Sequence, residues 1–380
     1  MKAIKIPFNR PCWVGSELAN ISDSMKSGHV SGNGEYTKKA QSLLRENLNS
    51  TSKVLLTTSC THALEMTAIL LDLQPGDEVI VPSFTFVSTA LAFVMHGAIP
   101  VFADIRPDTL NIDEATLESL ISGRTRAIVP VHYAGVSCDM DAIMDIAERY
   151  NLIVIEDNAH GLFGTYNGRN LGSIGHMATQ SFHETKNIIC GEGGALVIND
   201  SRFSERAEIL LEKGTNRANF FRGEVDKYTW VDKGSSYLMS NILAACLYGQ
   251  LLKSSEIQKK RKIIWNTYFD GLKAWAITNG VQLPYVPDGC EQAFHMFYLI
   301  LPSAQARSNF IDHMNSEGIS TVFHYLPLHE SPMGKKFNTS NNKCPVTSET
   351  AGRLVRLPFF IDLTHEQLNF VIGVVKQYQI

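Results

Sequence analysis

Short apolar runs alternate with amphipathic segments along the first half of the chain. The runs have the length and β-branched content of buried strands, and they lie at residues 53–57, 78–81, 99–102, 126–131, 152–156, 177–182 and 194–199. Helix-period patterns separate most of them, at residues 62–72, 86–96, 113–121 and 139–150. This alternation predicts an α/β fold with a mostly parallel seven-stranded sheet and helices on both faces. Because only a glycine-bearing turn joins the last two runs, we expect one strand of that pair to be antiparallel.

The pattern changes beyond Met239. A long helical stretch passes through Leu251 towards Ala274, and its charged segment 256–262 is expected to face solvent. Further on, strands are predicted at 296–301 and 320–324, helices at 304–316 and from Thr364, and a polar loop at 338–343. The sequence therefore predicts a large domain over residues 1–250 and a small C-terminal α+β domain over residues 251–380.

Composition narrows the function classes. With 44% hydrophobic and 19% charged residues, the chain has the balance of a globular protein with a substantial core. A net charge of −4 argues against nucleic acid as a partner, and no apolar stretch is long enough to predict a membrane span. The seven cysteines are scattered without metal-ligand spacing, so we expect neither a metal site nor a disulfide framework. Single thiols and an N-terminus without an apolar signal region favour a cytoplasmic location.

The segment around Lys186 is the most informative chemically. This lysine follows the apolar run 177–182 and precedes the glycine-rich turn Gly191-Glu-Gly-Gly194. An amine held in a pocket there can lose its proton and form a Schiff base with an aldehyde. A lysine in a strand-to-loop turn is more commonly a surface residue, so the assignment depends on partners elsewhere in the chain.

Two candidate partners follow the run 152–156. Asp157 stands at the predicted carboxyl end of that strand, where ligands of parallel sheets bind, and a carboxylate there can pair with a pyridinium nitrogen. Capping the next helix would explain the same aspartate. His160, one turn later, can donate to a phenolic oxygen or simply pack locally.

Two more candidates follow the first two strands. The segment Thr57-Thr-Ser-Cys60-Thr61-His62 places small hydroxyl residues at a helix start, where free N–H groups bind phosphate, although ordinary capping accounts for them as well. Phe86 follows the strand 78–81 and can cover a planar cofactor or belong to the core.

A phosphate cup, an aromatic lid, a carboxylate and a lysine in this order resemble the fold-type I pyridoxal-phosphate enzymes. Within them the chain resembles the DegT/StrS family of nucleotide-sugar aminotransferases from about Ile6 to its end. The segments that carry this resemblance include Pro75-Gly-Asp-Glu-Val79, Val129-Pro-Val-His132, Glu156-Asp157, Gly191-Glu-Gly-Gly194, His324-Tyr325 and Arg356-Leu-Pro358. At finer grain, Ser181-Phe-His-Glu-Thr-Lys-Asn187 and Lys213-Gly-Thr-Asn-Arg217 resemble the transaminases that form dTDP-4-amino-4,6-dideoxygalactose for enterobacterial common antigen.

The resemblance implies a pyridoxal 5'-phosphate-dependent transamination with L-glutamate as donor and dTDP-4-keto-6-deoxy-D-glucose as acceptor. It implies that Lys186 and Asp157 are catalytic. The cofactor would further be bound by Cys60, Thr61, Phe86, His160 and Ser181. It also implies a homodimer with shared active sites.

Substrate contacts are expected from local cations, because a nucleotide sugar carries a pyrophosphate and the chain is acidic overall. Arg217 and Arg222 stand in a predicted loop after a helix at 201–213, and Arg suits bidentate contact with phosphate oxygens. A solvated loop would contain the same charges. His324 is a third candidate substrate contact.

Departures from the family pattern leave alternatives open. The family often has Gln where this chain has His160, and Asn where it has Ser236. Related sugar dehydratases have histidine in place of the lysine, and Lys186 argues against that activity. A 3-keto substrate, the opposite stereochemistry at C4, and a non-catalytic cofactor or nucleotide-sugar sensor remain alternatives.

Overall fold

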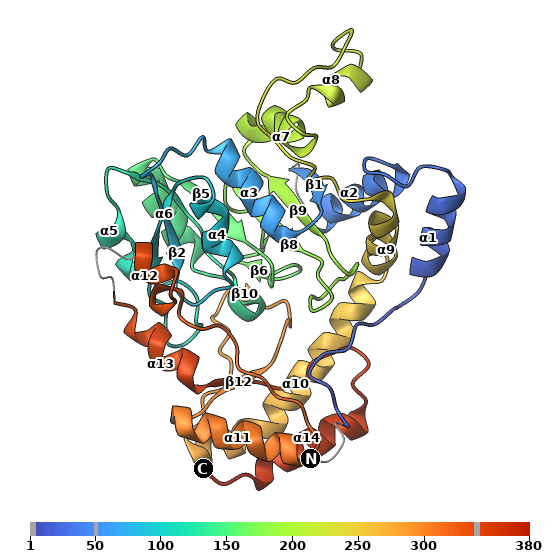
Figure 1. The fold of residues 1–380 in the computed structure, drawn as a ribbon. Coiled ribbons are helices and arrows are strands. Elements are labelled where there is room, and N and C mark those ends of the chain that lie inside the picture. The colour runs from blue at the N-terminus through green and yellow to red at the C-terminus, as the bar shows by residue number, and fades with distance from the viewer. Residues whose placement is uncertain (1–4, 49–51, 338–342) are drawn as a thin grey trace.

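The computed structural model describes residues 5–48, 52–337 and 343–380, and its centre is a seven-stranded sheet (Figure 1). The strand order is β1-β9-β8-β5-β4-β2-β3. The strands are β1 (Lys53–Thr57), β2 (Glu78–Pro82), β3 (Ile99–Ala103), β4 (Thr125–Ile128), β5 (Ile153–Asp157), β8 (Met177–Ser181) and β9 (Gly194–Ile198). All neighbours pair in parallel except those of β9, which is antiparallel to both β1 and β8. The predicted fold class and the reversed strand are confirmed.

Helices cover both faces of the sheet, because alternate strand residues point to opposite sides. On one face, Leu55, Val79 and Leu196 pack against α3 (Cys60–Leu70), α4 (Ser88–Val94) and α7 (Ser204–Leu211). On the other face, Val54 and Leu56 pack against α2 (Glu35–Asn47) and α9 (Asn241–Leu251), and the strands β2, β4 and β5 against α6 (Met140–Tyr150). Shorter helices complete this layer at α1 (Glu17–Lys26) and α5 (Leu117–Leu120).

The C-terminal part builds a separate core around a two-stranded antiparallel sheet. That sheet joins β11 (Tyr298–Ile300) and β12 (Leu354–Arg356). Around it lie α10 (Ser254–Asn279), α11 (Ala304–Ser316), α13 (Pro345–Arg353) and α14 (His365–Gln377), with α12 (Gly334–Phe337) beside the large sheet (Figure 1). Ile6 joins this second core and forms a bridge with Ile319. A third, small sheet contains β6 (Thr165–Tyr166), β7 (Arg169–Asn170) and β10 (Cys290–Glu291).

Three expectations for this part differ from the structure. The long helical stretch is two helices, because the chain leaves the helix at Leu252 and Lys253 between α9 and α10. The segment 256–262 is not wholly solvent-exposed: Ile257 and Arg261, one helical turn apart, are both buried. The segment 320–324 is not a strand and forms only the bridge from Val322 to Arg356. The remaining elements of this part agree with their predicted positions, while residues 338–342 of the predicted loop lie outside the described part of the chain.

Within the described residues, none of the helices has the length and apolar character that a membrane crossing requires.

Candidate active site

The residues predicted to be catalytic or to bind the cofactor lie near the carboxyl edge of the parallel strands. Asp157 ends β5 and Ser181 ends β8, while Cys60 begins α3 directly after β1. Lys186 lies in the turn that connects β8 with β9, and its backbone N–H donates to the His183 carbonyl at 2.9 Å. Phe182 closes the base of this turn, where its N–H donates to the Gly193 carbonyl at 2.8 Å. The reversed strand β9 therefore begins at the edge that Lys186 occupies, where Gly194 pairs with Ser181, and runs back to the opposite edge.

The Lys186 amine is unusually easy to deprotonate. Burial lowers the pKa of Lys186 to about 8, and the positive charge of Arg356 adds to the lowering. The neighbouring Cys60 and Asp157 act in the opposite direction on the same pKa. The charges of Cys60 and Asp157 therefore act on the Lys186 amine.

Asp157 is buried and is held in a fixed orientation. Its Oδ2 accepts a hydrogen bond from the Thr89 hydroxyl at 2.7 Å, and its Oδ1 accepts one from the Ala159 N–H at 3.2 Å. Burial raises the pKa of the Asp157 carboxyl, and the Thr89 and Ala159 hydrogen bonds oppose that rise. A cation placed beside this carboxylate would be stabilised by it.

The adjacent Glu156 has a structural role on the opposite side of β5. It accepts hydrogen bonds from His132 Nε2 at 2.9 Å and from the backbone N–H groups of Gly172, Ile174 and Gly175 at 2.7 to 2.8 Å. Burial alone would raise the pKa of Glu156, but these donors lower it below its ordinary value. Of the two neighbouring carboxylates, only Asp157 points into the site.

His160 is a buried, neutral imidazole. Its ring stacks on that of His295 at 4.2 Å between centroids, and its Nε2 is 3.2 Å from the Tyr325 hydroxyl. Burial lowers the pKa of His160 well below its ordinary value, and the charges of Lys186 and Arg356 lower it further. Its buried Nδ1 has no hydrogen-bond partner among the described residues, so this polar atom can form a hydrogen bond with a bound ligand.

Aromatic side chains form the wall opposite the sheet. The rings of His324 and Tyr325 stack at 3.6 Å, and His324 Nδ1 is 2.8 Å from the Tyr133 hydroxyl. Phe86 stands at the rim, 59% exposed, with its ring 6.4 Å from that of Tyr325. His324 is thus placed in the site, and Phe86 can cover a planar group between the two walls.

The start of α3 forms a cradle for an anion. The Ser59 side chain caps the helix by accepting from the His62 N–H at 3.1 Å, and Thr61 Oγ1 contacts Ser88 Oγ at 2.7 Å. A β-carbon at Gly194 would clash with the backbone of Ser59 and Cys60, so glycine lets β9 pass directly against the helix start. The helix N-terminus supplies backbone N–H groups and positive potential, as a phosphate requires.

The two arginines proposed for the pyrophosphate lie elsewhere on the chain, at α8 (Arg217–Phe221). This helix belongs to an arm that projects beyond α7 (Figure 1). Arg222 pairs with Glu208 at 2.8 Å and with Glu224 at 2.7 Å, whereas Arg217 is 3.7 Å from Glu212. None of these contacts connects either arginine to Lys186 or Asp157 of the same chain.

Four residues of the site had no role assigned from the sequence: Thr89, His295, Tyr325 and Arg356. Thr89 lies within the predicted helix 86–96, where a hydroxyl gives no functional signal. His295, Tyr325 and Arg356 come from the C-terminal part, and only its folding against the large sheet brings them to the site. Tyr325 and Arg356 belong to segments that carry the family resemblance, and this resemblance was the signal in the sequence that could have identified them as site residues.

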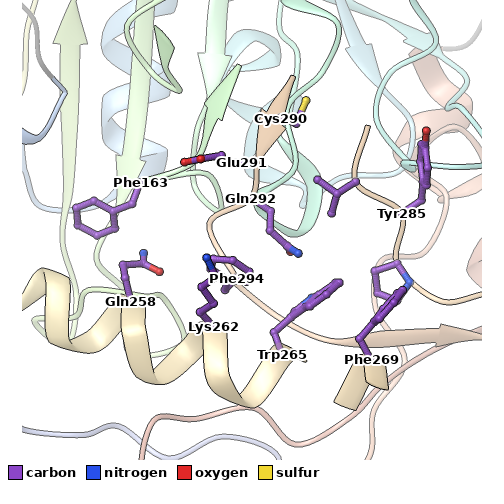
Figure 2. Close-up of a pocket in the computed structure, with 12 residues that line it drawn as sticks. Phe163, Gln258, Lys262, Trp265, Phe269, Tyr285, Cys290, Glu291, Gln292 and Phe294 are labelled. Carbon is purple, nitrogen blue, oxygen red and sulfur yellow. The ribbon is translucent and has the colours of Figure 1, made fainter. Parts of the chain in front are cut away.

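A second and larger cavity, of about 570 Å³, lies beside α10 (Figure 2). Its wall includes Trp265 and Phe269, whose rings stack at 5.1 Å, together with Phe163, Tyr285 and Phe294. None of the predicted site residues lines it. Lys186 instead lines a much smaller pocket, together with Asn9, Glu184 and Arg261.

Comparison with known proteins agrees with this geometry. The family model described as the DegT/DnrJ/EryC1/StrS aminotransferase family matches residues 11–376. The spore coat polysaccharide biosynthesis protein SpsC of Bacillus subtilis is 33% identical over 98% of this chain and 96% of its own length. A putative sugar aminotransferase of Streptococcus pneumoniae, Spr1654, has a TM-score of 0.90 at 26% identity, covering 98% of each chain. The aminotransferase TlmJ of Streptoalloteichus hindustanus has a TM-score of 0.88 at 27% identity, covering 99% of this chain and 98% of its own.

Proposed function

The chain belongs to the DegT/DnrJ/EryC1/StrS aminotransferase family and is a pyridoxal-phosphate-dependent sugar aminotransferase, and we propose its substrates. The acceptor is dTDP-4-keto-6-deoxy-D-glucose, the donor is L-glutamate, and the product is dTDP-4-amino-4,6-dideoxy-D-galactose. The observation that best supports this chemistry is the convergence of Lys186, Asp157 and His160 at one edge of the sheet.

The residues present fit the cofactor. The unpartnered Nδ1 of His160 suits its ring hydroxyl, Asp157 its pyridine nitrogen, and Cys60, Thr61 and Ser181 its phosphate. Phe86 lies where it can cover the ring. When bound, pyridoxal phosphate supplies a carbonyl carbon that accepts the amino group and a ring that withdraws electrons from the adjacent carbon.

The protein's own groups then orient the reactants and move the proton. Lys186 would hold the cofactor covalently at rest and, as a free amine, would take the proton from the α-carbon of the donor. Its pKa of about 8 lets the amine both accept and return a proton near neutral pH. Asp157, oriented by Thr89, would stabilise positive charge on the pyridine nitrogen, and neutral His160 would act as a hydrogen-bond partner rather than as a second acid.

The finer substrate assignment is supported by the local sequence resemblance around Ser181–Asn187 and 213–217. For the pyrophosphate, Arg217 is the better of the two arginines, because its 3.7 Å contact with Glu212 is loose while Arg222 pairs with two carboxylates. Since both lie on the projecting arm, the site that they serve is that of a second copy of the chain.

A homodimer is part of the proposal. The helix α4 begins next to Phe86 and presents Val87, Leu91 and Met95, one helical turn apart, to solvent. Leu18 and Met25 on α1 form another exposed apolar pair. A second copy that covers α4 would bury this stripe and close the mouth of the site at the same time.

The test is to incubate the purified holoenzyme with glutamate and, separately, the 4-keto and 3-keto isomers of dTDP-6-deoxyglucose, and to identify the product by NMR. We expect amination at C4 with the galacto configuration. Amination of the 3-keto isomer, or the gluco configuration at C4, would replace the proposed substrate or product. A lack of product from both isomers would refute the substrate class.

A further inference from the structure

The imidazole of His160 is hydrogen-bonded on one side only. Its Nε2 is 3.2 Å from the Tyr325 hydroxyl, whereas its buried Nδ1 has no hydrogen-bond partner among the described residues. A neutral imidazole carries one ring proton, so one of its nitrogens donates and the other accepts. The partner of Nε2 therefore decides whether Nδ1 presents a proton or a lone pair to a bound ligand.

The Tyr325 hydroxyl can supply the proton of this contact. Among the described residues, His160 Nε2 is the one group with which that hydroxyl forms a hydrogen bond. Donation to Nε2 satisfies the hydroxyl proton, and the ring proton of His160 is then on Nδ1. The opposite arrangement, in which Nε2–H donates to the Tyr325 oxygen, would leave the hydroxyl proton without an acceptor among the same residues. Counting donors and acceptors thus favours a protonated Nδ1.

A second imidazole holds the His160 ring in its orientation. The His295 ring stacks on it, with the centroids 4.2 Å apart and an angle of 16° between the planes. Asn187 donates its Nδ2 to the Ala293 carbonyl at 2.6 Å, so its Oδ1 is the acceptor that lies 2.9 Å from His295 Nδ1. The ring proton of His295 is therefore on Nδ1. Both stacked rings are neutral, because burial lowers the pKa of His160 and the pKa of His295 well below the ordinary value.

We propose that Tyr325 is a positioning residue that sets the tautomer of His160, so that Nδ1–H donates to the ring oxygen of pyridoxal phosphate. The inference rests on the proposed function, in which His160 bonds to that oxygen. The phenolic oxygen of the cofactor is acidic and carries negative charge near neutral pH, so a donor matches it and a lone pair does not. Tyr325 acts on the cofactor through His160.

The contact also joins two parts of the chain. His160 follows β5 of the large sheet, whereas Tyr325 precedes α12 in the C-terminal part. The donor that faces the cofactor therefore depends on the packing of the C-terminal part against the large sheet. Loss of the Tyr325 hydroxyl should weaken the hold on the ring oxygen without changing the groups that hold the phosphate.

The test compares two cofactors that differ by one hydroxyl group. Pyridoxal 5'-phosphate has the ring hydroxyl, and 3-deoxypyridoxal 5'-phosphate lacks it. The affinity for each is measured by equilibrium dialysis of the reconstituted holoenzyme, for the wild type, Tyr325→Phe and the control Tyr133→Phe. Tyr133 belongs to the same aromatic wall, but its hydroxyl is 2.8 Å from His324 Nδ1 and does not bond to His160.

We expect Tyr325→Phe to weaken the binding of pyridoxal phosphate by about 3- to 10-fold, as the loss of one hydrogen bond implies. Its affinity for the deoxy cofactor should stay within about two-fold of the wild type, because the group that His160 contacts is absent there. In Tyr133→Phe the ratio of the two affinities should equal that of the wild type. A merely structural role of Tyr325 would weaken both cofactors alike.

Replacement of His160 by glutamine provides the rescue. An amide has a permanent N–H donor, so it needs no partner to fix its protonation. In the His160→Gln background, Tyr325→Phe should therefore change the affinity for pyridoxal phosphate by less than about two-fold. The tautomer itself is read by NMR of holoenzyme with ¹⁵N-labelled histidine rings. The signals that disappear in His160→Gln should show the proton on Nδ1.

An unchanged affinity for pyridoxal phosphate in Tyr325→Phe, equal weakening of both cofactors, or a His160 proton on Nε2 would overturn the inference and leave the proposed function in place. A wild type that binds the two cofactors equally would remove the His160 contact, and the inference with it. A wild type without affinity for pyridoxal phosphate would refute the proposed function itself.

Discussion

At the scale of single residues, the local environment gives different roles to side chains of the same chemical type that are adjacent in the sequence. Glu156 and Asp157 are neighbouring carboxylates, and the alternation of β5 sends them to opposite sides. Glu156 receives four hydrogen bonds and is structural, whereas Asp157 keeps one side open towards the site. The sequence could predict Lys186 and Asp157 because strand ends in parallel sheets face ligands. It could not predict Thr89, because the value of that hydroxyl depends on its 2.7 Å approach to Asp157.

The Thr89–Asp157 pair predicts a graded loss of activity. Asp157→Asn removes the charge that stabilises the protonated pyridine, so we expect kcat to fall by about 100-fold or more while the cofactor stays bound. Thr89→Val keeps the charge and removes its orienting hydrogen bond, so the loss should be smaller. Steady-state kinetics with absorbance measurement of bound cofactor distinguishes the two. Near-normal turnover in Asp157→Asn would contradict the assigned role.

The lowered pKa of Lys186 predicts a pH dependence in protein freed of cofactor. A lysine is reactive only when neutral, so reactivity rises as pH passes upward through its pKa, here about 8 instead of the ordinary value of about 10.4. At pH 7 roughly a tenth of Lys186 should be neutral. Labelling with an amine-reactive anhydride, followed by mass spectrometry across pH 6–11, should give half-maximal reaction at Lys186 near pH 8. A midpoint above 10 would show that the site does not activate this amine.

At the scale of elements, the site is built where strand ends meet a helix start. The alternation of strands and helices could be predicted because it depends on the spacing of hydrophobic residues within each short segment. The apolar pattern of the segment 320–324 predicts a strand, but the chain forms one bridge there and then turns inward with His324 and Tyr325. Contacts of this kind, between the C-terminal part and the large sheet, depend on tertiary packing and leave no local signal.

Gly194 gives a test at this scale. Gly194→Ala should force β9 away from the start of α3, because the new β-carbon meets the backbone of Ser59 and Cys60. We expect a loss of about 1–3 kcal/mol in stability and weaker retention of the cofactor phosphate. The matched control is Gly123→Ala, where a β-carbon would have nothing within 4 Å. Thermal melts and cofactor dialysis measure both effects. Equal behaviour of the two variants would contradict the close approach.

At the scale of the whole molecule, the apolar surface at the mouth of the site supports the proposed dimer, in which a second copy of the chain would cover that surface. Phe86, Val87, Leu91 and Met95 gather around α4, and the arm with Arg217 projects away from the chain's own site (Figure 1). A dimer would explain both features, because it would bury the apolar residues around α4 and would let the arm with Arg217 contact the second copy. Sequence pattern alone could not indicate this, because exposure is a property of the folded chain.

A charged side chain introduced into the exposed apolar stripe on α4 is predicted to separate the two copies of the proposed dimer. Met95 is 61% exposed, so Met95→Asp should barely affect the fold of one chain while it opposes burial at an interface. We expect sedimentation to show a shift from dimer towards monomer, with a parallel loss of activity. Ile277→Asp is the control, because Ile277 is 82% exposed on α10, away from the site. An active monomer in the wild type at assay concentration would rule out the shared-site dimer.

Replacement of Lys186 tests the central claim, that this chain is a sugar aminotransferase working through that amine, most directly. Turnover of the keto sugar with glutamate is measured for the wild type, for Lys186→Ala and for Lys262→Ala, whose lysine lines the separate cavity beside α10. We expect Lys186→Ala to fold and to lose at least about 10,000-fold in turnover, and Lys262→Ala to retain near-normal activity. Appreciable turnover by a folded Lys186→Ala protein would contradict the account.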